Sequence, residues 1–164
     1  MAKEIKLVFG AGYNDGSLGY SVTYIDQCTG KKRNTRAYSA WQSMIKRCYS
    51  NTHNRAGYYD KIGVCEDWLS FQKFAAWFEQ VDRPEYAKDQ EWYVMDKDLK
   101  GGVQYSPETV LLIPNFLNVA IGSRHKSISQ KTYNKCVNQV NRGLLTKEVL
   151  ELLVPYLNEE KLNK

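Results

Sequence analysis

The chain has no long apolar run, and this absence excludes one large class of proteins. Its apolar stretches are far shorter than the roughly 20 residues that a transmembrane helix needs, so we expect no membrane partner. The first residues include Glu4 and lead into only a short apolar run, which is not the pattern of a secretory signal peptide. The remaining composition, 43% hydrophobic and 25% charged residues, is typical of globular proteins. We therefore expect a folded protein of the cytoplasm.

Histidine and paired cysteine are also scarce. The only histidines are His53 and His125, which excludes a multi-histidine metal site. No two cysteines stand at the close spacing that a zinc ribbon or finger requires. In a reducing compartment the cysteines are expected to be free thiols. They are Cys28, Cys48, Cys65 and Cys136.

Acidic residues are missing from two long windows of the chain. None lies between Asp26 and Asp60 or between Glu108 and Glu148, although both windows are rich in Lys and Arg. The net charge of the whole chain is +5. A basic surface without acids favours a polyanion, because each phosphate that it neutralises releases counterions. Alternatively, these bases lie on solvated faces and bind nothing. We expect DNA as the partner. The candidate DNA contacts are Lys31, Lys32, Arg33, Arg36, Arg47, Arg55, Arg124, His125 and Lys126.

The spacing of apolar residues predicts an α+β fold. Segments rich in β-branched and aromatic residues predict strands, and apolar residues at three- and four-residue steps predict helices. Trp41 and Met44 form one such stripe and Trp68, Phe71 and Phe74 another, and both are expected in the core. The expected strands are 4–9, 20–25, 92–95 and 109–113. The expected helices are 39–49, 67–80, 115–120 and 146–161. Segment 124–143 is polar, basic and weakly patterned.

The order strand, Asp-rich loop, strand and helix over 92–120 is the order of a ββα-metal element. Other motifs precede it or lie within it. They are Gly12-Tyr13-Asn14-Asp15, Tyr38-x-x-Trp41-x-x-Met44, Arg47-Cys48-Tyr49-Ser50, Val64-Cys65-Glu66-x-Trp68, Met95-Asp96-Lys97-Asp98-Leu99 and Tyr105-Ser106-Pro107-Glu108-Thr109. With these motifs, the stretch from about Tyr13 to Lys126 resembles phage-encoded HNH-type proteins of the homing-endonuclease kind. Those proteins often carry an added DNA-binding domain like that of certain plant transcription factors.

This resemblance covers about two-thirds of the chain. It implies an HNH-like domain over 1–126, in which a small ββα element packs with the two aromatic-rich helices. Residues 127–164 lie outside the resemblance and form a basic segment followed by the C-terminal helix.

The resemblance also implies a metal site and a catalytic site. In the complete family motif, an Asp-His pair ends the first strand, with Asp on the metal and His as the general base. Asp96 matches that Asp, whereas Lys97 stands where the His belongs. Glu108 stands where an Asn orients the His, and Asn118 stands where the helix supplies a metal ligand. The base of the family motif is therefore replaced.

Lys97 changes the chemistry that such a site offers. The reference pKa of Lys is about 10.4, against about 6.5 for His, and the neighbouring Asp96 and Asp98 favour the charged form. A protonated Lys97 can bind the scissile phosphate or stabilise a leaving oxygen. Alternatively, Asp96 and Asp98 together bind Mg²⁺ or Mn²⁺ and the metal activates water, or His53 or His125 supplies a base. In a structural alternative, the two aspartates only cap a tight turn.

Two classes of function follow from these residues. The first is a DNA-binding, HNH-like endonuclease that hydrolyses phosphodiesters with a metal ion. The second is a catalytically inactive DNA-binding regulator, or a phage inhibitor protein, on a nuclease-derived scaffold. The residue that separates them is Lys97, because a His at that position would favour the enzyme. A host protein is a further candidate partner, and the final helix could mediate self-association. If the chain is phage-encoded, its compartment is the host cytoplasm.

Overall fold

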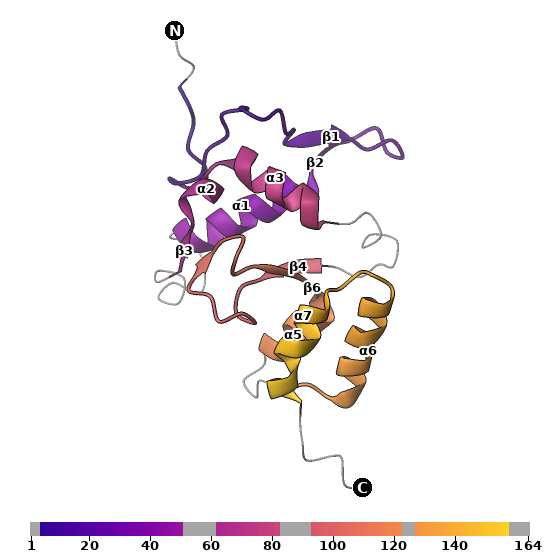
Figure 1. The fold of residues 1–164 in the computed structure, drawn as a ribbon. Helices are drawn as coiled ribbons and strands as arrows, with labels where there is room; N and C mark the ends of the chain where they lie inside the picture. The colour runs from indigo at the N-terminus through magenta and orange to yellow at the C-terminus, as the bar shows by residue number, and fades with distance from the viewer. Residues whose placement is uncertain (1–3, 51–61, 83–92, 123–126, 158–164) are drawn as a thin grey trace, which may run out of the picture. The chain divides into compact units, whose positions relative to one another are not determined.

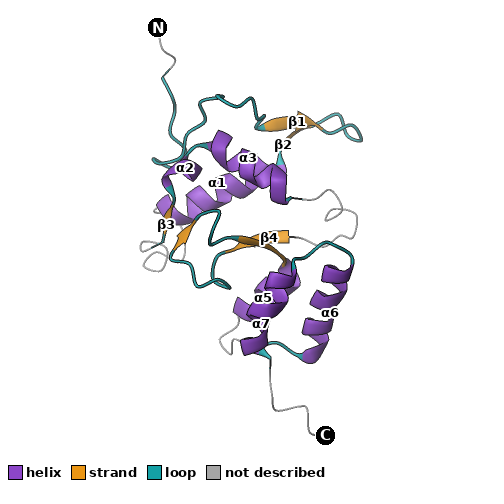
Figure 2. Ribbon diagram, viewed as in Figure 1, coloured by secondary structure: helices purple, strands orange, loops and turns teal. Residues whose placement is uncertain are grey.

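The computed structural model describes residues 4–50, 62–82, 93–122 and 127–157 (Figure 1). Helices and short strands are mixed along the chain (Figure 2), which confirms the expected α+β class. In these ranges, no helix is both long enough and apolar enough to cross a membrane.

The chain divides into two compact units. The first contains residues 1–81 and 103–109, and the second contains residues 82–102 and 110–164. This division differs from the one expected at residue 126, because the C-terminal helices share a hydrophobic core with the ββα element. The aromatic-rich helices belong to the first unit and the ββα element to the second.

The first unit combines short strands with helices. Strand β1 pairs antiparallel with β2, and β3 pairs parallel with β5. The elements are β1 (Thr23–Ile25), β2 (Lys32–Asn34), α1 (Arg36–Tyr49), β3 (Gly63–Val64), α2 (Glu66–Leu69), α3 (Phe71–Val81) and β5 (Gln104–Tyr105). Of the expected strands, 20–25 is observed in part as β1, whereas 4–9 contributes only an isolated bridge between Val8 and Gly12.

Helix α1 starts earlier than its apolar pattern predicted. It begins at Arg36, because the Thr35 hydroxyl accepts a hydrogen bond from the Tyr38 N–H at 3.1 Å and caps the first turn. The single helix expected over 67–80 is two helices. The chain is extended at Ser70, between α2 and α3.

The aromatic stripes meet in the core of the first unit, as the sequence predicted. Trp41, Trp68 and Phe74 are almost completely buried. The Trp68 and Phe74 rings meet edge to face, with 5.1 Å between centroids. The indole Nε1 of Trp41 donates to the carbonyl of Trp68 at 2.8 Å, so the polar edge of a buried ring is satisfied.

The motif at 12–15 docks the N-terminal segment on these helices. The Tyr13 N–H donates to the Leu69 carbonyl and the Tyr13 carbonyl accepts from the Phe71 N–H, both at 2.8 Å. A Cβ at Gly12 would lie 2.7 Å from Cζ2 of Trp41, so this position requires glycine. The motif therefore has a packing role in this unit.

A buried glutamine holds the loop that follows. The Oε1 of Gln72 accepts from the N–H groups of Leu18 at 3.3 Å and Tyr20 at 2.9 Å. Its Nε2 donates to Oδ1 of Asn14 at 2.7 Å and to the carbonyl of Tyr20 at 3.0 Å. Gln72 has no exposed surface, and its amide is fully hydrogen-bonded inside the unit.

The second unit contains the expected strand, loop, strand and helix. Strand β4 pairs antiparallel with β6, with Asp96 opposite Leu111. Helix α5 begins directly after β6 and packs against both strands. The elements are β4 (Tyr93–Asp96), β6 (Leu111–Pro114), α5 (Asn115–Gly122), α6 (Gln130–Asn141), α7 (Lys147–Leu153) and a 3₁₀ helix (Val154–Tyr156).

Helix α6 lies in the segment where the sequence predicted no element. The Ser129 hydroxyl caps it by accepting from the Thr132 N–H at 3.2 Å. Its Cys136 is fully buried in an aliphatic core with residues of α5 and α7. The expected helix 146–161 is shorter: α7 ends at Leu153, and a 3₁₀ turn follows around Pro155, which has no N–H to continue an α-helix.

Candidate functional site

Asp96, the expected metal ligand, is buried at the end of β4. Its side chain is 5% exposed, and its Oδ1 accepts from the Leu99 N–H at 2.8 Å. Burial raises the pKa of this carboxyl above its usual range, although the Leu99 N–H opposes the rise. Asp96 thus caps the turn after β4, which is the structural alternative that the sequence left open.

Lys97 and Asp98 form an ion pair in the same turn. The Lys97 side chain is only 4% exposed, whereas that of Asp98 is 62% exposed. The ammonium of Lys97 binds Oδ1 of Asp98, and the turn is closed by the N–H of Gly102 donating to the Lys97 carbonyl at 3.0 Å. A buried ammonium ion therefore occupies one oxygen of the carboxylate that was expected to help Asp96 bind a metal.

Asn118, the expected helix ligand, is half-buried on α5. It follows Leu117, whose side chain is fully buried in the core of the second unit, and α5 packs against β4. Over the ranges that the structure describes, no group of three or more His, Cys, Asp or Glu side chains could hold a metal ion. A cation at this place would depend on Asp96 together with Asn118 or backbone oxygens.

Glu108, expected in the position of an orienting residue, belongs to the first unit, whereas Lys97 belongs to the second. Its side chain is exposed. Burial raises the pKa of the Cys65 thiol, and the negative charges of Asp67 and Glu108 add to this rise. Glu108 thus lies near Cys65, which follows β3, and it comes soon after β5 in the chain.

Three of the expected DNA contacts lie together on the β1–β2 hairpin. Lys31, Lys32 and Arg33 are all exposed. The Nε of Arg33 pairs with Oδ2 of Asp26 at 2.8 Å, and Oδ1 of Asp26 accepts from the Cys28 N–H at 2.9 Å. Asp26 therefore holds the turn in shape and fixes Arg33, while the two lysines extend from the hairpin surface.

The other expected DNA contacts are dispersed. Arg36 is exposed on the first turn of α1, directly after the hairpin, and Arg47 is half-buried in the last turn of the same helix. A base in the last turn also stabilises a helix through its dipole, so Arg47 has a structural explanation. Arg55, Arg124, His125 and Lys126 lie outside the described residues, as does His53.

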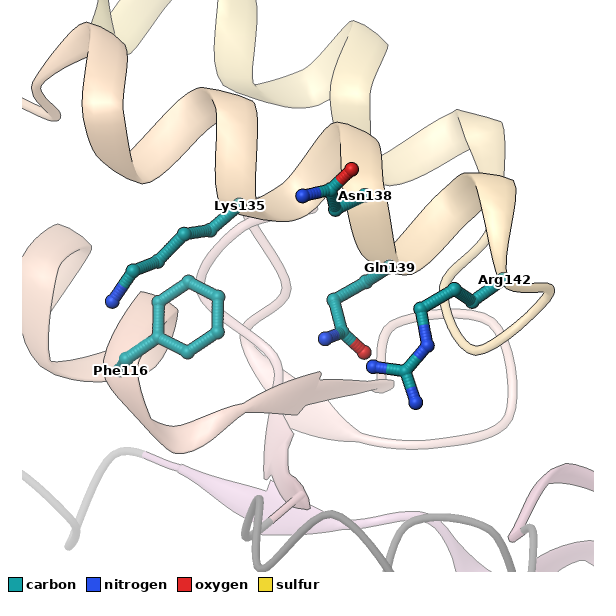
Figure 3. A pocket seen from close by; sticks show the side chains of 5 residues that line it. All are labelled: Phe116, Lys135, Asn138, Gln139 and Arg142. Atoms are coloured by element: carbon teal, nitrogen blue, oxygen red, sulfur yellow. The ribbon is translucent and has the colours of Figure 1, made fainter.

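A basic hollow in the second unit was missed by the sequence analysis. It has a volume of about 360 Å³ and is lined by Phe116, Lys135, Asn138, Gln139 and Arg142 (Figure 3). The ammonium of Lys135 lies 5.3 Å from the centroid of the Phe116 ring, a cation–π contact. The signal that could have identified α6 is the apolar spacing of Tyr133, Cys136, Val137 and Val140.

Comparison of the chain with protein-family models, with curated proteins and with solved structures gives no match.

Proposed function

We propose that the protein binds double-stranded DNA, and that the β1–β2 hairpin supplies phosphate contacts. The observation that supports this most directly is the exposure of Lys31, Lys32 and Arg33 on one short hairpin. Arg33 is oriented by Asp26, and no acidic residue follows Asp26 until Asp60. Two exposed lysines beside an arginine that one aspartate orients favour a phosphate backbone, because counterions are released on contact.

The surface beside these charges has further features of a nucleic-acid contact. Tyr24 and Ile25 on β1 are 50% and 54% exposed, so apolar surface adjoins the lysines. Side chains of this kind beside a basic stripe can contact the sugars of a duplex while the Lys and Arg side chains bind its phosphates. The DNA would be that of the cytoplasm, or of a host cell if the chain is phage-encoded.

A divalent cation fits the described donors poorly. Mg²⁺ prefers several oxygen ligands in octahedral geometry, whereas Oδ1 of Asp96 already accepts from Leu99 and Asp98 is paired with Lys97. The Lys97 ammonium also adds positive charge beside Asp96, which disfavours a second cation. DNA binding without hydrolysis is therefore our first conclusion.

An endonuclease is the second candidate function. It is favoured by the β4–β6–α5 order, with Asp96 at the end of the first strand and Asn118 on the helix. If the protein cleaves, supercoiled plasmid incubated with Mg²⁺ or Mn²⁺ should be nicked, and Lys97→Ala should lower the rate by about 10²–10³-fold, the effect of one lost electrostatic stabiliser. If the protein binds DNA without cleaving it, plasmid nicking by wild type and by Lys97→Ala should equal that of a reaction without protein.

DNA binding is tested by fluorescence anisotropy with a labelled duplex over a series of NaCl concentrations. Affinity should fall linearly on a log–log plot, and Lys31→Ala/Lys32→Ala should reduce the slope by about 2 if each lysine contacts one phosphate. The matched control is Lys6→Ala/Lys147→Ala, which removes the same charge from exposed positions that are not part of the hairpin. Absence of binding by wild type, or equal slopes for both double variants, contradicts the proposal.

A further inference from the structure

The exposed face of helix α6 contains only basic side chains and side-chain amides. Its exposed positions follow the spacing of three and four residues that places side chains on one side of a helix. None of them is acidic or apolar, and no acidic residue lies between Glu108 and Glu148. The exposed residues are Gln130, Lys131, Asn134, Lys135, Asn138, Asn141 and the adjoining Arg142.

The opposite face anchors this helix firmly. Cys136 is fully buried, and Gln139, which lies between Cys136 and Lys135 around the helix, is 8% exposed. The backbone carbonyl of Gln139 accepts from the N–H groups of Leu144 at 2.9 Å and Leu145 at 3.3 Å, which closes the turn into α7. The donor-rich face is therefore presented by a rigid element, as precise recognition requires.

The basic hollow beside α6 contains a buried donor that points to a ligand. Oε1 of Gln139 accepts from the Tyr93 hydroxyl at 2.8 Å, but Nε2 makes no hydrogen bond to any residue in the described ranges. Buried amide donors are rarely left without an acceptor. Figure 3 shows the Gln139 side chain between those of Phe116 and Arg142, which also line the hollow. A hydrogen-bond acceptor that enters the hollow would therefore meet the Gln139 amide.

We propose that α6 enters the major groove of double-stranded DNA and reads base edges with Asn138. This inference rests on the proposed function. It assigns recognition of the DNA sequence to α6, whereas the β1–β2 hairpin contacts phosphates. The major groove, about 12 Å wide, admits an α-helix, and Asn there pairs with adenine through both amide groups. Lys131 and Arg142 stand eleven positions apart, or about 16 Å along the helix, and contact the phosphates on either side.

The chemistry of the face selects duplex DNA over duplex RNA. The major groove of A-form RNA is deep and too narrow for side chains to read. A helix about 18 Å long, as expected for the 12 residues of α6, would meet RNA only at its phosphates. An RNA duplex of the same sequence should therefore bind without dependence on Asn138.

The test selects bound duplexes from a random DNA pool with wild type, Asn138→Ala and the control Asn115→Ala, an exposed asparagine on α5. Wild type and Asn115→Ala should select one common sequence. Asn138→Ala should lose preference at one base pair by roughly 5–150-fold, the range for one bidentate base contact. Asn138→Lys should shift the preferred base at that pair towards guanine. Circular dichroism spectra identical to wild type show that the variants are folded.

The phosphate contacts are tested separately. Lys131→Ala/Arg142→Ala should reduce the salt slope by about 2 without changing the selected sequence, while Lys147→Ala on α7 should change neither. If wild type binds DNA but selects no sequence, or if Asn138→Ala selects the wild-type sequence, the assignment of α6 is wrong and the hairpin proposal stands. If wild type binds no DNA, the proposed function itself is wrong.

Discussion

Each of the two units buries one glutamine, and the two side-chain amides differ in how completely they are hydrogen-bonded. In the first unit, Gln72 is fully buried and both ends of its amide are hydrogen-bonded to the loop that contains Asn14 and Tyr20. In the second unit, Gln139 is nearly as buried, but only its Oε1 has a partner in the described ranges. The complete hydrogen bonding of Gln72 stabilises the fold of the first unit. The Nε2 of Gln139, which has no partner in the described ranges and lies beside a hollow, indicates a ligand instead.

The residues that carried the resemblance to nucleases make contacts inside the protein, as Gln72 does. The residues Gly12 to Asp15 carried part of the resemblance to nucleases, and the structure uses Gly12 and Tyr13 to dock a loop on the core. The residues around Asp96 also bind one another, because Asp96 caps a turn and Lys97 pairs with Asp98. The exposed donors of α6 and of the β1–β2 hairpin are the features that internal structure explains least.

The largest effect expected from this comparison is the loss of the closed network. Gln72→Leu retains the volume but leaves the N–H and C=O groups of Tyr20 and the N–H of Leu18 without their acceptor or donor. Each buried polar group left unpaired costs about 1–3 kcal/mol. Because the loop is partly exposed, we expect a total loss of about 2–4 kcal/mol in the free energy of unfolding, measured by urea denaturation.

The control for this prediction is Gln80→Leu, at an exposed position of the same helix α3. An exposed substitution of this kind should change the free energy of unfolding by less than about 0.5 kcal/mol. If Gln72→Leu behaves like Gln80→Leu, the hydrogen bonds of Gln72 do not stabilise the first unit, and the contrast with Gln139 fails.

The network of Gln72 also shows what the sequence could not reveal. Its partners lie 52 to 58 residues away, and no local pattern identifies contacts at that separation. The stripe of Trp41 and Met44 was easy to recognise because large apolar residues recur every three or four positions. In α6, the same period is carried by Tyr133, Cys136 and Val140 among many polar residues, and Asn and Thr have low helix propensity.

For the candidate site, the order of the elements was predictable from the sequence, but the burial of its side chains was not. The order strand, turn, strand and helix was visible in the sequence, because Gly101 and Pro114 delimit the apolar runs of the two strands. Burial of Lys97 beside an exposed Asp98 depends on how the turn packs, which adjacent charges in a sequence do not determine. The exposed lysines of the hairpin were identified by charge alone.

A second prediction sharpens the structural role of the N-terminal motif. Gly12→Ala places a Cβ 2.7 Å from Cζ2 of Trp41, a ring with no room to move because it is fully buried. We expect a loss of about 1–3 kcal/mol, the usual cost of overpacking, measured as a lower midpoint in urea. Gly63→Ala is the control, since a Cβ there meets no atom within 4 Å. A neutral Gly12→Ala would show that the docked loop is not a fixed part of the first unit.

The smallest expected effect concerns the charge of Asp96. Burial raises the folded-state pKa of this carboxyl above its unfolded value, so the folded protein holds the proton more tightly than the unfolded chain. The stabilisation is fully present below the unfolded pKa of about 3.9 and is lost as the pH rises through the raised pKa. Asp96→Asn cannot ionise, but its side-chain oxygen can still accept from the Leu99 N–H. The stability of wild type relative to Asp96→Asn should therefore fall as the pH rises through this acid range.

The same pair of proteins decides whether Asp96 holds a metal ion. A ligand that binds only the folded state raises its stability by RT ln(1 + [L]/Kd), about 2.7 kcal/mol at a hundredfold excess over Kd. Because this carboxylate is buried and already accepts from the Leu99 N–H, while Lys97 is paired with Asp98, we expect Mg²⁺ at neutral pH to stabilise wild type no more than Asp96→Asn. A rise in the melting temperature of wild type alone would establish a cation site at Asp96. The turn after β4 would then be a functional centre, and the endonuclease would become the first candidate function.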